Sequence, residues 1–224
     1  MSTNVEKSPD RQSNWKELWG SDEWQAWSNI LRNPFNNKTL QKWWKSVFEG
    51  TGWSSQGQKI QRKAAWFVTE GCSCEYRYSG TVWNPSVFPP WLKDITLQVM
   101  KKVGWPRWIR TLPNSCNINL YENGNNYVQW HSDDEPLFNG LAENCTIISL
   151  SLGASRTFQI KMKKGGRGRI VSSTVLDDGD ILTMEGMFQK YLKHRLKRDR
   201  RVLNSRINIT WRWIKNHDKD TCPL

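Results

Sequence analysis

Residues 119–135 read Asn119-Leu-Tyr121-Glu-Asn-Gly-Asn-Asn-Tyr-Val-Gln-Trp-His131-Ser-Asp133-Asp-Glu. The pattern predicts a strand, a turn at the Asn-Gly pair and a second short strand that ends in His-x-Asp. Side chains two positions apart on a strand point the same way, so His131 and Asp133 are expected to converge on one point. A His-x-Asp pair alone is weak evidence, because most such pairs are solvated loop residues.

A distant histidine could complete a metal site with this pair. The chain has three histidines, His131, His194 and His217. His217 lies in the polar tail of residues 215–224 and is expected to be solvated, which leaves the other two as the available pair. Two histidines and one carboxylate form the facial triad of non-haem Fe(II) oxygenases, which keeps coordination positions open for O2 chemistry. The spacing therefore indicates a plausible metal site made of His131, Asp133 and His194.

A second stretch near the C-terminus alternates strictly between polar and apolar residues. This alternation predicts a half-buried strand whose apolar layer contains Ile207, Ile209, Trp211 and Trp213. The opposite face contains Arg206, Asn208, Thr210 and Arg212. The two arginines are separated by roughly 20 Å of strand, and their long side chains can lean together around a small dicarboxylate. Guanidinium groups suit carboxylates because they offer two parallel charge-assisted hydrogen bonds. A solvated charged face on an edge strand is the alternative.

Composition indicates an anionic partner. The 33 Lys and Arg residues exceed the 21 Asp and Glu residues, giving a formal net charge of +12. Nucleic acid is the commonest partner of such a chain, and a generally basic surface is the alternative. No apolar run approaches the ~20 residues that span a bilayer, and the first residues lack the apolar core of a signal peptide. We expect an intracellular protein, in the nucleus or the cytoplasm, that is a monomer without a membrane segment.

The cysteines argue against a disulfide framework. They are five in number and include no Cys-x-x-Cys pair. Cys72-Ser-Cys74 could be half of a zinc site, but the sequence shows no second Cys/His pair to complete it. Ordinary core or loop thiols are the expectation.

The N-terminal region is rich in tryptophan. Apolar residues recur at steps of three and four over residues 14–31, which favours a helix, and a second helix is predicted from Thr39 to Gly50 or Gly52. Packing against the rest of the protein is favoured for this stripe over direct contact with nucleic acid. We expect a partly helical extension over residues 1–58, a main domain over residues 59–214 and a polar tail.

Several spaced motifs, in this order, together resemble the AlkB family of Fe(II)- and 2-oxoglutarate-dependent nucleic-acid dealkylases, over about residues 60–214. The motifs are Asn119-x-Tyr121, His131-x-Asp133-Asp134-Glu135, Ser149-Leu-Ser-Leu-Gly153, Arg156-x-Phe158, Gly179-Asp-Ile-Leu, Met184-x-Gly186, His194 and Arg206-x-Asn208-x-Thr-x-Arg212. The His-Ser-Asp-Asp-Glu run is most similar to the branch that repairs DNA and RNA.

The resemblance implies roles for these residues. His131, Asp133 and His194 would hold Fe(II), and Arg206 would bind the distal carboxylate of the co-substrate 2-oxoglutarate. The remaining contacts to 2-oxoglutarate would come from Asn119, Tyr121, Asn208 and Arg212. With O2, the family oxidises an N-methyl group of a base such as 1-methyladenine or 3-methylcytosine and releases it as formaldehyde. The substrate would be an alkylated base in single-stranded DNA or RNA, or one flipped out of a duplex.

The substrate contacts implied by the resemblance lie in two segments. Asp134 and Glu135 would meet the edge of the alkylated base. Tyr76 and Tyr78 match the aromatic-x-aromatic pattern of the family's nucleotide-recognition lid, where they would stack on the base or grip its phosphate. The alternative for both tyrosines is packing within a hairpin. The chain departs from the family by inserting residues 68–74 ahead of this pattern, which affects the shape of the lid.

The fold expected from the pattern is mainly β with flanking helices. Many short strands separated by turn residues fit a jelly roll, whose open mouth between two facing sheets holds a site. The family's double-stranded β-helix is a version of this fold. Two other functions remain open: a 2-oxoglutarate-dependent hydroxylase of a protein or small molecule, and a non-catalytic nucleic-acid-binding module.

Overall fold

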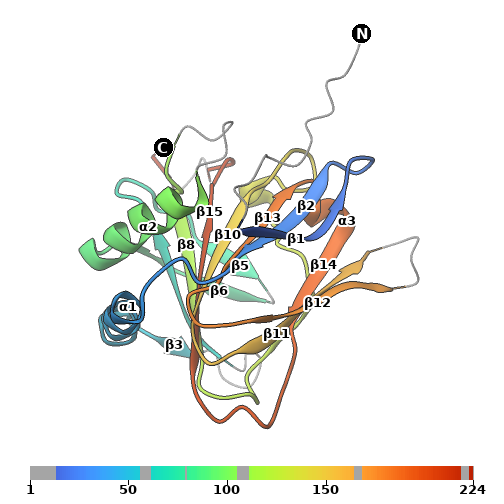
Figure 1. Cartoon of the computed structure of the whole chain (residues 1–224). Helices are drawn as coiled ribbons and strands as arrows, with labels where there is room; N and C mark the ends of the chain where they lie inside the picture. The colour runs from blue at the N-terminus through green and yellow to red at the C-terminus, as the bar shows by residue number, and fades with distance from the viewer. Residues whose placement is uncertain are drawn as a thin grey trace.

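The computed structural model describes residues 14–55, 62–78, 80–104, 111–163, 168–217 and 222–223. Within these ranges the fold is mainly β, as predicted, and consists of two facing sheets, a small hairpin and a few helices. Figure 1 shows the two long helices on one side of the large sheet and the smaller sheet on its other side. None of the described helices has the length and apolar character needed to cross a membrane.

The described part of the large sheet has nine strands in the order β1-β2-β13-β10-β15-β8-β4-β3, with β7 added in parallel beside β4. Except for β7, every strand pair in it is antiparallel. The strands are β1 (Trp15–Ser21), β2 (Ala26–Leu31), β3 (Ser54–Ser55), β4 (Lys63–Val68), β7 (Pro85–Val87), β8 (Ser115–Tyr121), β10 (Ile147–Gly153), β13 (Ile181–Gly186) and β15 (Arg206–Arg212).

The smaller sheet has the order β12-β11-β14-β9, and a separate hairpin pairs β5 with β6. These strands are β5 (Tyr76–Tyr78), β6 (Thr81–Trp83), β9 (Val128–His131), β11 (Arg156–Met162), β12 (Ile170–Leu176) and β14 (Leu192–Leu196). The helices are α1 (Asn37–Gly50), α2 (Pro90–Val103), α3 (Phe188–Tyr191) and the 3-10 turn η2 (Pro136–Phe138). The predicted strand-turn-strand of residues 119–131 thus crosses from the large sheet to the smaller one.

The alternation of residues in β15 and β8 gives each strand one apolar face and one polar face. On β15, Ile207, Ile209 and Trp211 are fully buried against the helices α1 and α2. The opposite face of the strand contributes polar side chains to the space between the sheets. The antiparallel register places Asn208 opposite Asn119 on β8. Because side chains alternate with a period of two, these neighbouring strands present one continuous polar floor.

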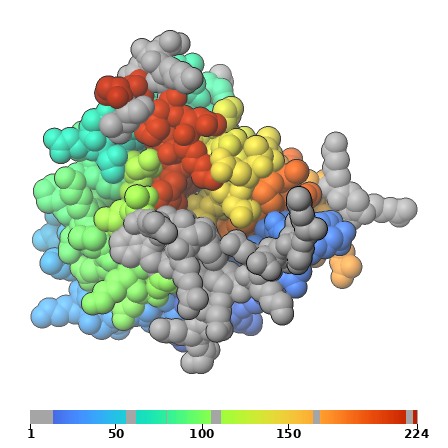
Figure 2. All heavy atoms as spheres, turned by 90° about the horizontal axis from the view of Figure 1, so that it is seen from above, coloured from blue at the N-terminus to red at the C-terminus, as the bar shows by residue number. Residues whose placement is uncertain are grey.

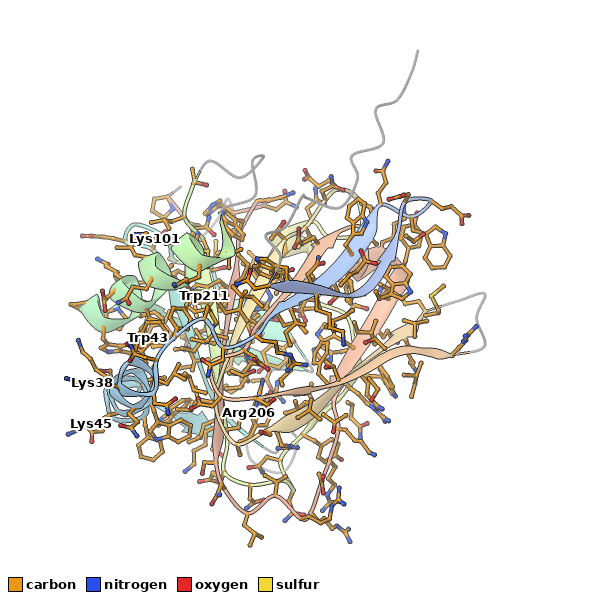
Figure 3. All side chains as sticks on the ribbon, in the orientation of Figure 1. Lys38, Trp43, Lys45, Lys101, Arg206 and Trp211 are labelled. Carbon is orange, nitrogen blue, oxygen red and sulfur yellow. The ribbon has the colours of Figure 1, made fainter. Side chains whose placement is uncertain are left out.

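The helices cover the outer face of the large sheet as their sequences predict. The side chain of Asn36 caps α1 by accepting a hydrogen bond of 2.9 Å from the backbone N–H of Thr39, so the helix begins at Asn37, two residues before the predicted start. Figure 3 shows Trp43 on the inner side of α1, with Lys38 and Lys45 on its outer side. On the neighbouring helix α2, Pro90 is the first residue and Gly104 ends the helix with a φ of 69°.

The helix predicted over residues 14–31 is wrong, because this segment forms the hairpin of β1 and β2. All six residues of β2 are buried, and the strand pairs with β13 inside the large sheet. A strand covered on both faces shows no simple alternation, so its tryptophans can mimic helical spacing. The turn lies at residues 22–25, and the run Gly20-Ser-Asp22 that leads into it was the available hairpin signal. Tertiary pairing therefore overrides the local pattern here.

Candidate metal and co-substrate site

Three side chains of the predicted metal triad converge between the two sheets. His131 is the last residue of β9, and His194 lies opposite it on β14. Asp133 follows two residues after β9, and its Oδ1 atom lies 3.4 Å from His131 Nε2 and 3.8 Å from His194 Nε2. Such separations allow one ion, with bonds of about 2 Å to nitrogen and oxygen, to contact all three. The triad lies on the wall of a cavity of about 620 Å³.

The protonation states of the two histidines suit metal binding. Burial lowers the pKa of His194 to about 3, with a further contribution from the neighbouring His131, so the imidazole is neutral. Burial also lowers the pKa of His131. The Nδ1 atom of His131 lies 2.8 Å from the carbonyl oxygen of Gln129, and an Nδ1–H that donates there leaves Nε2 free to ligate. Both rings therefore offer the neutral imidazole that a metal requires.

Arg212 fixes the carboxylate of the triad. Its Nε donates to Asp133 Oδ2 at 3.0 Å, and its Nη2 donates to the same oxygen. Burial opposes ionisation of Asp133, but Arg212 and then the two histidines hold the pKa of this carboxyl below its usual range. The backbone N–H of Asp133 donates to the Gln189 side chain at 2.9 Å. Oδ1 is thus left to face the histidines. The resemblance implied a contact between Arg212 and 2-oxoglutarate; two of its nitrogens hold the metal ligand, and its buried Nη1 has no hydrogen-bond partner among the described residues.

Arg206 lies at the other end of the polar face of β15 and has a different environment. Figure 3 labels it between the two layers of strands, and its residue exposure is 1%. Its Nη2 donates to Ser151 Oγ at 2.8 Å, but its buried Nε and Nη1 have no hydrogen-bond partner among the described residues. Burial lowers the pKa of Arg206 to about 10. A buried cation with unused donors and no carboxylate beside it in the described chain offers hydrogen bonds and charge to an anion.

The other predicted co-substrate residues surround the same end of the cavity. Tyr121 lies between the cavity and Arg206, whose guanidinium is 5.4 Å from the centre of its ring. Asn208 Nδ2 donates to Ser149 Oγ at 2.6 Å, and Asn119 Oδ1 accepts from Arg62 Nε at 2.7 Å. Asn119, Tyr121 and Asn208 all line the cavity. The structure therefore brings together the metal triad, a polar floor and a buried guanidinium, which fits a dicarboxylate that reaches from the metal to Arg206.

The two tyrosines of the predicted lid have different surroundings. Tyr76 is 3% exposed and packs against Trp66, with ring centroids 4.8 Å apart. Its hydroxyl donates to Glu135 Oε1 at 3.1 Å, and Glu135 lies on the cavity wall. Burial, followed by the charge of Asp133, raises the pKa of Glu135 to about 7. Tyr76 therefore orients an acidic group of the wall.

Tyr78 is the more accessible of the pair. Its ring stacks on Trp83, with centroids 5.8 Å apart and an interplanar angle of 12°, and it lines the cavity. Arg62 donates to the Tyr78 hydroxyl at 3.2 Å. The other predicted acidic contact, Asp134, is exposed and also lines the cavity, where it pairs with Lys163 at 2.9 Å.

Two further cavity residues were missed by the sequence reasoning. Arg62 bridges the lid and the polar floor through Tyr78 and Asn119. Trp130 lines the cavity, and its ring lies between the cations of Lys161 and Arg195, at 4.6 and 4.4 Å from its centroid. The alternation of polar and aromatic residues just before His131 was a signal for Trp130. Arg62 precedes its strand and gave no comparable signal.

Comparisons with known proteins agree with this geometry. The profile of the 2OG-Fe(II) oxygenase superfamily matches residues 22–212. Human "Alpha-ketoglutarate-dependent dioxygenase alkB homolog 3" is 39% identical over 108 residues, which cover 45% of this chain and 36% of that protein. Mouse "DNA oxidative demethylase ALKBH2" is 31% identical over 161 residues, which cover 69% of this chain and 62% of that protein. The resemblance to AlkB proteins is thus confirmed.

The chain spans about a third to a half of the length of the AlkB homolog 3 proteins that it matches. Among solved structures, OsALKBH1 superposes with a TM-score of 0.57 over 83% of this chain and 97% of that chain. The sequence identity to OsALKBH1 is 15%, so this likeness concerns the fold, which is the jelly roll that the sequence predicts. The profile match extends over most of the chain and includes every member of the metal triad. This protein belongs to the 2OG-Fe(II) oxygenase superfamily.

Proposed function

We propose that this protein is an oxidative demethylase of N-alkylated bases in DNA or RNA. The observation that carries the proposal is a facial triad on the wall of one cavity together with a buried, underused guanidinium, that of Arg206, which contacts Tyr121 on the same wall. When bound, Fe(II) would activate O2, and 2-oxoglutarate would supply two of the four electrons that reduce it, the other two coming from the C–H bond that is oxidised. The chain's own residues then have three tasks, which are to hold the carboxylates, to exclude bulk water and to orient the base.

The co-substrate end of the cavity is built for a dianion. The distal carboxylate would meet the two unused donors of Arg206, and the hydroxyl of Tyr121 and the amides of Asn119 and Asn208 would border the rest of the molecule. A charge-assisted hydrogen bond contributes about 1.5–3 kcal/mol, so Arg206 is the main source of affinity for 2-oxoglutarate. Arg212 would hold the metal ligand Asp133 through Nε and Nη2, and its unused Nη1 would be available to the co-substrate.

The other end of the cavity suits a flat, electron-poor base. The walls there combine the acidic side chain of Glu135 with the rings of Tyr78 and Trp130. Stacking of a base on an aromatic ring contributes about 1–3 kcal/mol to binding and is possible for every base. N-methylation gives adenine or cytosine a positive charge, which an adjacent carboxylate stabilises. Lys161 and Arg195, which flank Trp130, would contact the phosphates on either side of the base.

The test uses single-stranded DNA and RNA oligonucleotides that carry 1-methyladenine or 3-methylcytosine. Each is incubated in air with the protein, Fe(II), 2-oxoglutarate and ascorbate, and is then analysed by mass spectrometry. Loss of about 14 mass units per lesion, with release of formaldehyde, is expected for a demethylase acting on an accessible base. Succinate formation without any change in the oligonucleotides would contradict the proposed substrate and favour a hydroxylase of a protein or small molecule.

Tyr78→Ala is expected to raise the KM for an alkylated oligonucleotide about 5- to 100-fold, because a stacking surface is lost. Tyr78→Phe keeps the ring and should stay within a few-fold of the wild type, although it loses the hydrogen bond from Arg62. Val82→Ala, at an exposed position of β6, is the matched control. Steady-state kinetics with the oligonucleotide and with 2-oxoglutarate varied separately provide the measurement. Equal effects of both Tyr78 variants would contradict a stacking role.

A further inference from the structure

A second cluster of metal-ligating side chains lies apart from the triad. It contains Cys72, Cys74, His217 and Cys222, whose ligand atoms all lie within 4.8 Å of one another. The prediction that His217 is a solvated tail residue, and that Cys72-Ser-Cys74 lacks a second pair, is therefore wrong. Figure 2 shows the red C-terminal segment beside the blue-green segment that contains the first two cysteines. The tail folds back and supplies the second half of the set.

The distances within the cluster are those of tetrahedral zinc ligands. Bonds of about 2.3 Å to sulfur and 2.0 Å to nitrogen place tetrahedral ligands about 3.7 Å apart for two sulfurs and about 3.5 Å for sulfur and nitrogen. The Sγ atoms of Cys222 and Cys72 are 3.7 Å apart. The Nδ1 atom of His217 lies 3.8, 3.6 and 3.2 Å from the Sγ atoms of Cys72, Cys74 and Cys222. The two sulfurs of a disulfide are about 2.05 Å apart, so the 3.7 Å between Cys222 and Cys72 shows that these cysteines are not disulfide-bonded.

Backbone contacts hold the tail half of the cluster in position. Ile214 N–H donates to Asn114 Oδ1 at 2.6 Å, and the Asn114 side-chain amide donates back to the Ile214 carbonyl at 3.1 Å. The next residue, Lys215, donates its N–H to the Leu137 carbonyl at 3.0 Å. His217 therefore follows a segment that is anchored by several hydrogen bonds. These bonds, rather than contacts with the cysteines, bring the His217 ring to the cluster.

A turn and a buried indole hold the other half. Cys72 N–H closes a turn to the Thr69 carbonyl at 3.1 Å, and Gly71 adopts a φ of 84° within that turn. The indole N–H of Trp66 donates to the Cys74 carbonyl at 2.8 Å. The three cysteines of the cluster are buried and the histidine is half-buried. These features describe a preformed, closed site rather than thiols that meet by chance on a surface.

We propose that Cys72, Cys74, His217 and Cys222 bind one structural Zn²⁺ ion. Four protein ligands leave no open position, which distinguishes this site from the triad and excludes a catalytic role for its metal. Three thiolates and one imidazole are soft ligands that suit zinc, whereas the nitrogen and oxygen ligands of the triad suit Fe(II). The difference in ligand chemistry would direct two metals to two sites in one chain.

The zinc would join the C-terminal tail to the base of the lid. Cys74 precedes the strand β5 by two residues, and the Trp66 ring that holds its carbonyl also packs on Tyr76. The ion would therefore fix the inserted segment that leads into the two lid tyrosines. This consequence rests on the proposed function, whereas zinc binding itself does not.

The first experiment measures metal content in the full-length protein purified without chelators. Elemental analysis by inductively coupled plasma mass spectrometry is expected to find about one zinc per chain in the wild type. The same value is expected for Asp133→Ala, which lacks a triad ligand. Cys222→Ser and His217→Ala should lose most of the zinc. Cys116→Ala removes a buried thiol outside the cluster and should keep it. A wild type that holds no zinc after reconstitution with an equimolar amount would overturn the proposal.

A second experiment needs only the wild type, so poorly folding variants do not limit it. Co²⁺ is substituted for zinc, and sulfur-to-cobalt charge-transfer absorption together with intense visible bands of tetrahedral cobalt is expected. A mercurial reagent should release the zinc into a coloured indicator as it titrates the three cysteine ligands. Octahedral cobalt spectra alone, or a Cys72–Cys222 disulfide in the native protein by non-reducing peptide mapping, would contradict a zinc site.

Kinetics separate the zinc site from the demethylase proposal. If the zinc site and the demethylase function are both correct, Cys222→Ser should raise the KM for the oligonucleotide several-fold. The KM for 2-oxoglutarate should stay that of the wild type. If zinc is bound but no oligonucleotide is demethylated, the metal site stands and the proposed substrate fails. Loss of zinc with an unchanged oligonucleotide KM would contradict the link to the lid.

Discussion

Asp133→Ala is expected to abolish turnover and also to lower the free energy of unfolding by about 3–5 kcal/mol. The first effect follows because the ion loses its only carboxylate ligand in the triad. The second follows because Arg212, which is 4% exposed, keeps its charge and loses the oxygen that accepts two of its hydrogen bonds. Urea unfolding in the presence of a chelator measures the stability, and succinate formation measures the activity.

The double variant Asp133→Ala/Arg212→Met separates the two effects. Methionine fills much of the volume of the arginine and removes the buried charge, so most of the lost stability should return while activity stays absent. Arg212→Met alone should be destabilised, because it leaves the buried carboxylate without its main partner. If the double variant were as unstable as the sum of the two single variants, the ion pair would not be the source of the destabilisation.

Arg206→Met is expected to raise the KM for 2-oxoglutarate by about 100-fold or more, since each charge-assisted hydrogen bond to the distal carboxylate contributes about 1.5–3 kcal/mol. The stability of the protein without co-substrate should change by no more than about 1 kcal/mol, or rise, because the guanidinium is buried with two unused nitrogens. Activity and stability are therefore expected to respond in different ways to the same substitution.

Arg156 offers a matched control for this experiment. It is 2% exposed and lies 5.9 Å from the Tyr121 ring, which Arg206 also contacts. However, Arg156 donates to the carbonyl oxygens of Asn123, Asn126 and Lys197. Arg156→Met should therefore lower the free energy of unfolding by about 2–3 kcal/mol, with little change in the KM for 2-oxoglutarate. If Arg206→Met lost stability without a change in the KM for 2-oxoglutarate, while Arg156→Met raised that KM, Arg206 would be structural and the anion would bind elsewhere.

The local patterns that predicted structure correctly were those in which one face of an element is buried and the other is not. On β15 the two-residue period separates Ile207 and Ile209 from Asn208, and the structure shows the same separation. On α1 the apolar stripe marks the face that packs on the sheet. The segment from Ala26 to Leu31 failed because it is buried on both faces, which removes the period that distinguishes a strand from a helix.

The metal triad was predictable because short-range geometry determines most of it. His131 and Asp133 are two residues apart, and few histidines were available to join them. The partner of Arg212 was not predictable in this way. Spacing along β15 placed the two arginines on one face, but only the packing of the sheets decides that Arg212 reaches Asp133 while Arg206 remains unused.

The sequence by itself determined the mainly-β class, the alternation of β15, the approximate extent of α1 and the grouping of His131, Asp133 and His194. Each of these depends on neighbours within a few residues or on the small number of histidines. The tertiary structure alone decided that residues 15–31 form a hairpin within the large sheet and that Tyr76 supports Glu135. It also brought His217 and Cys222 to Cys72 and Cys74. Apart from the local pairing of β1 with β2, these contacts join residues more than fifty positions apart, and their distances depend on how the whole chain packs.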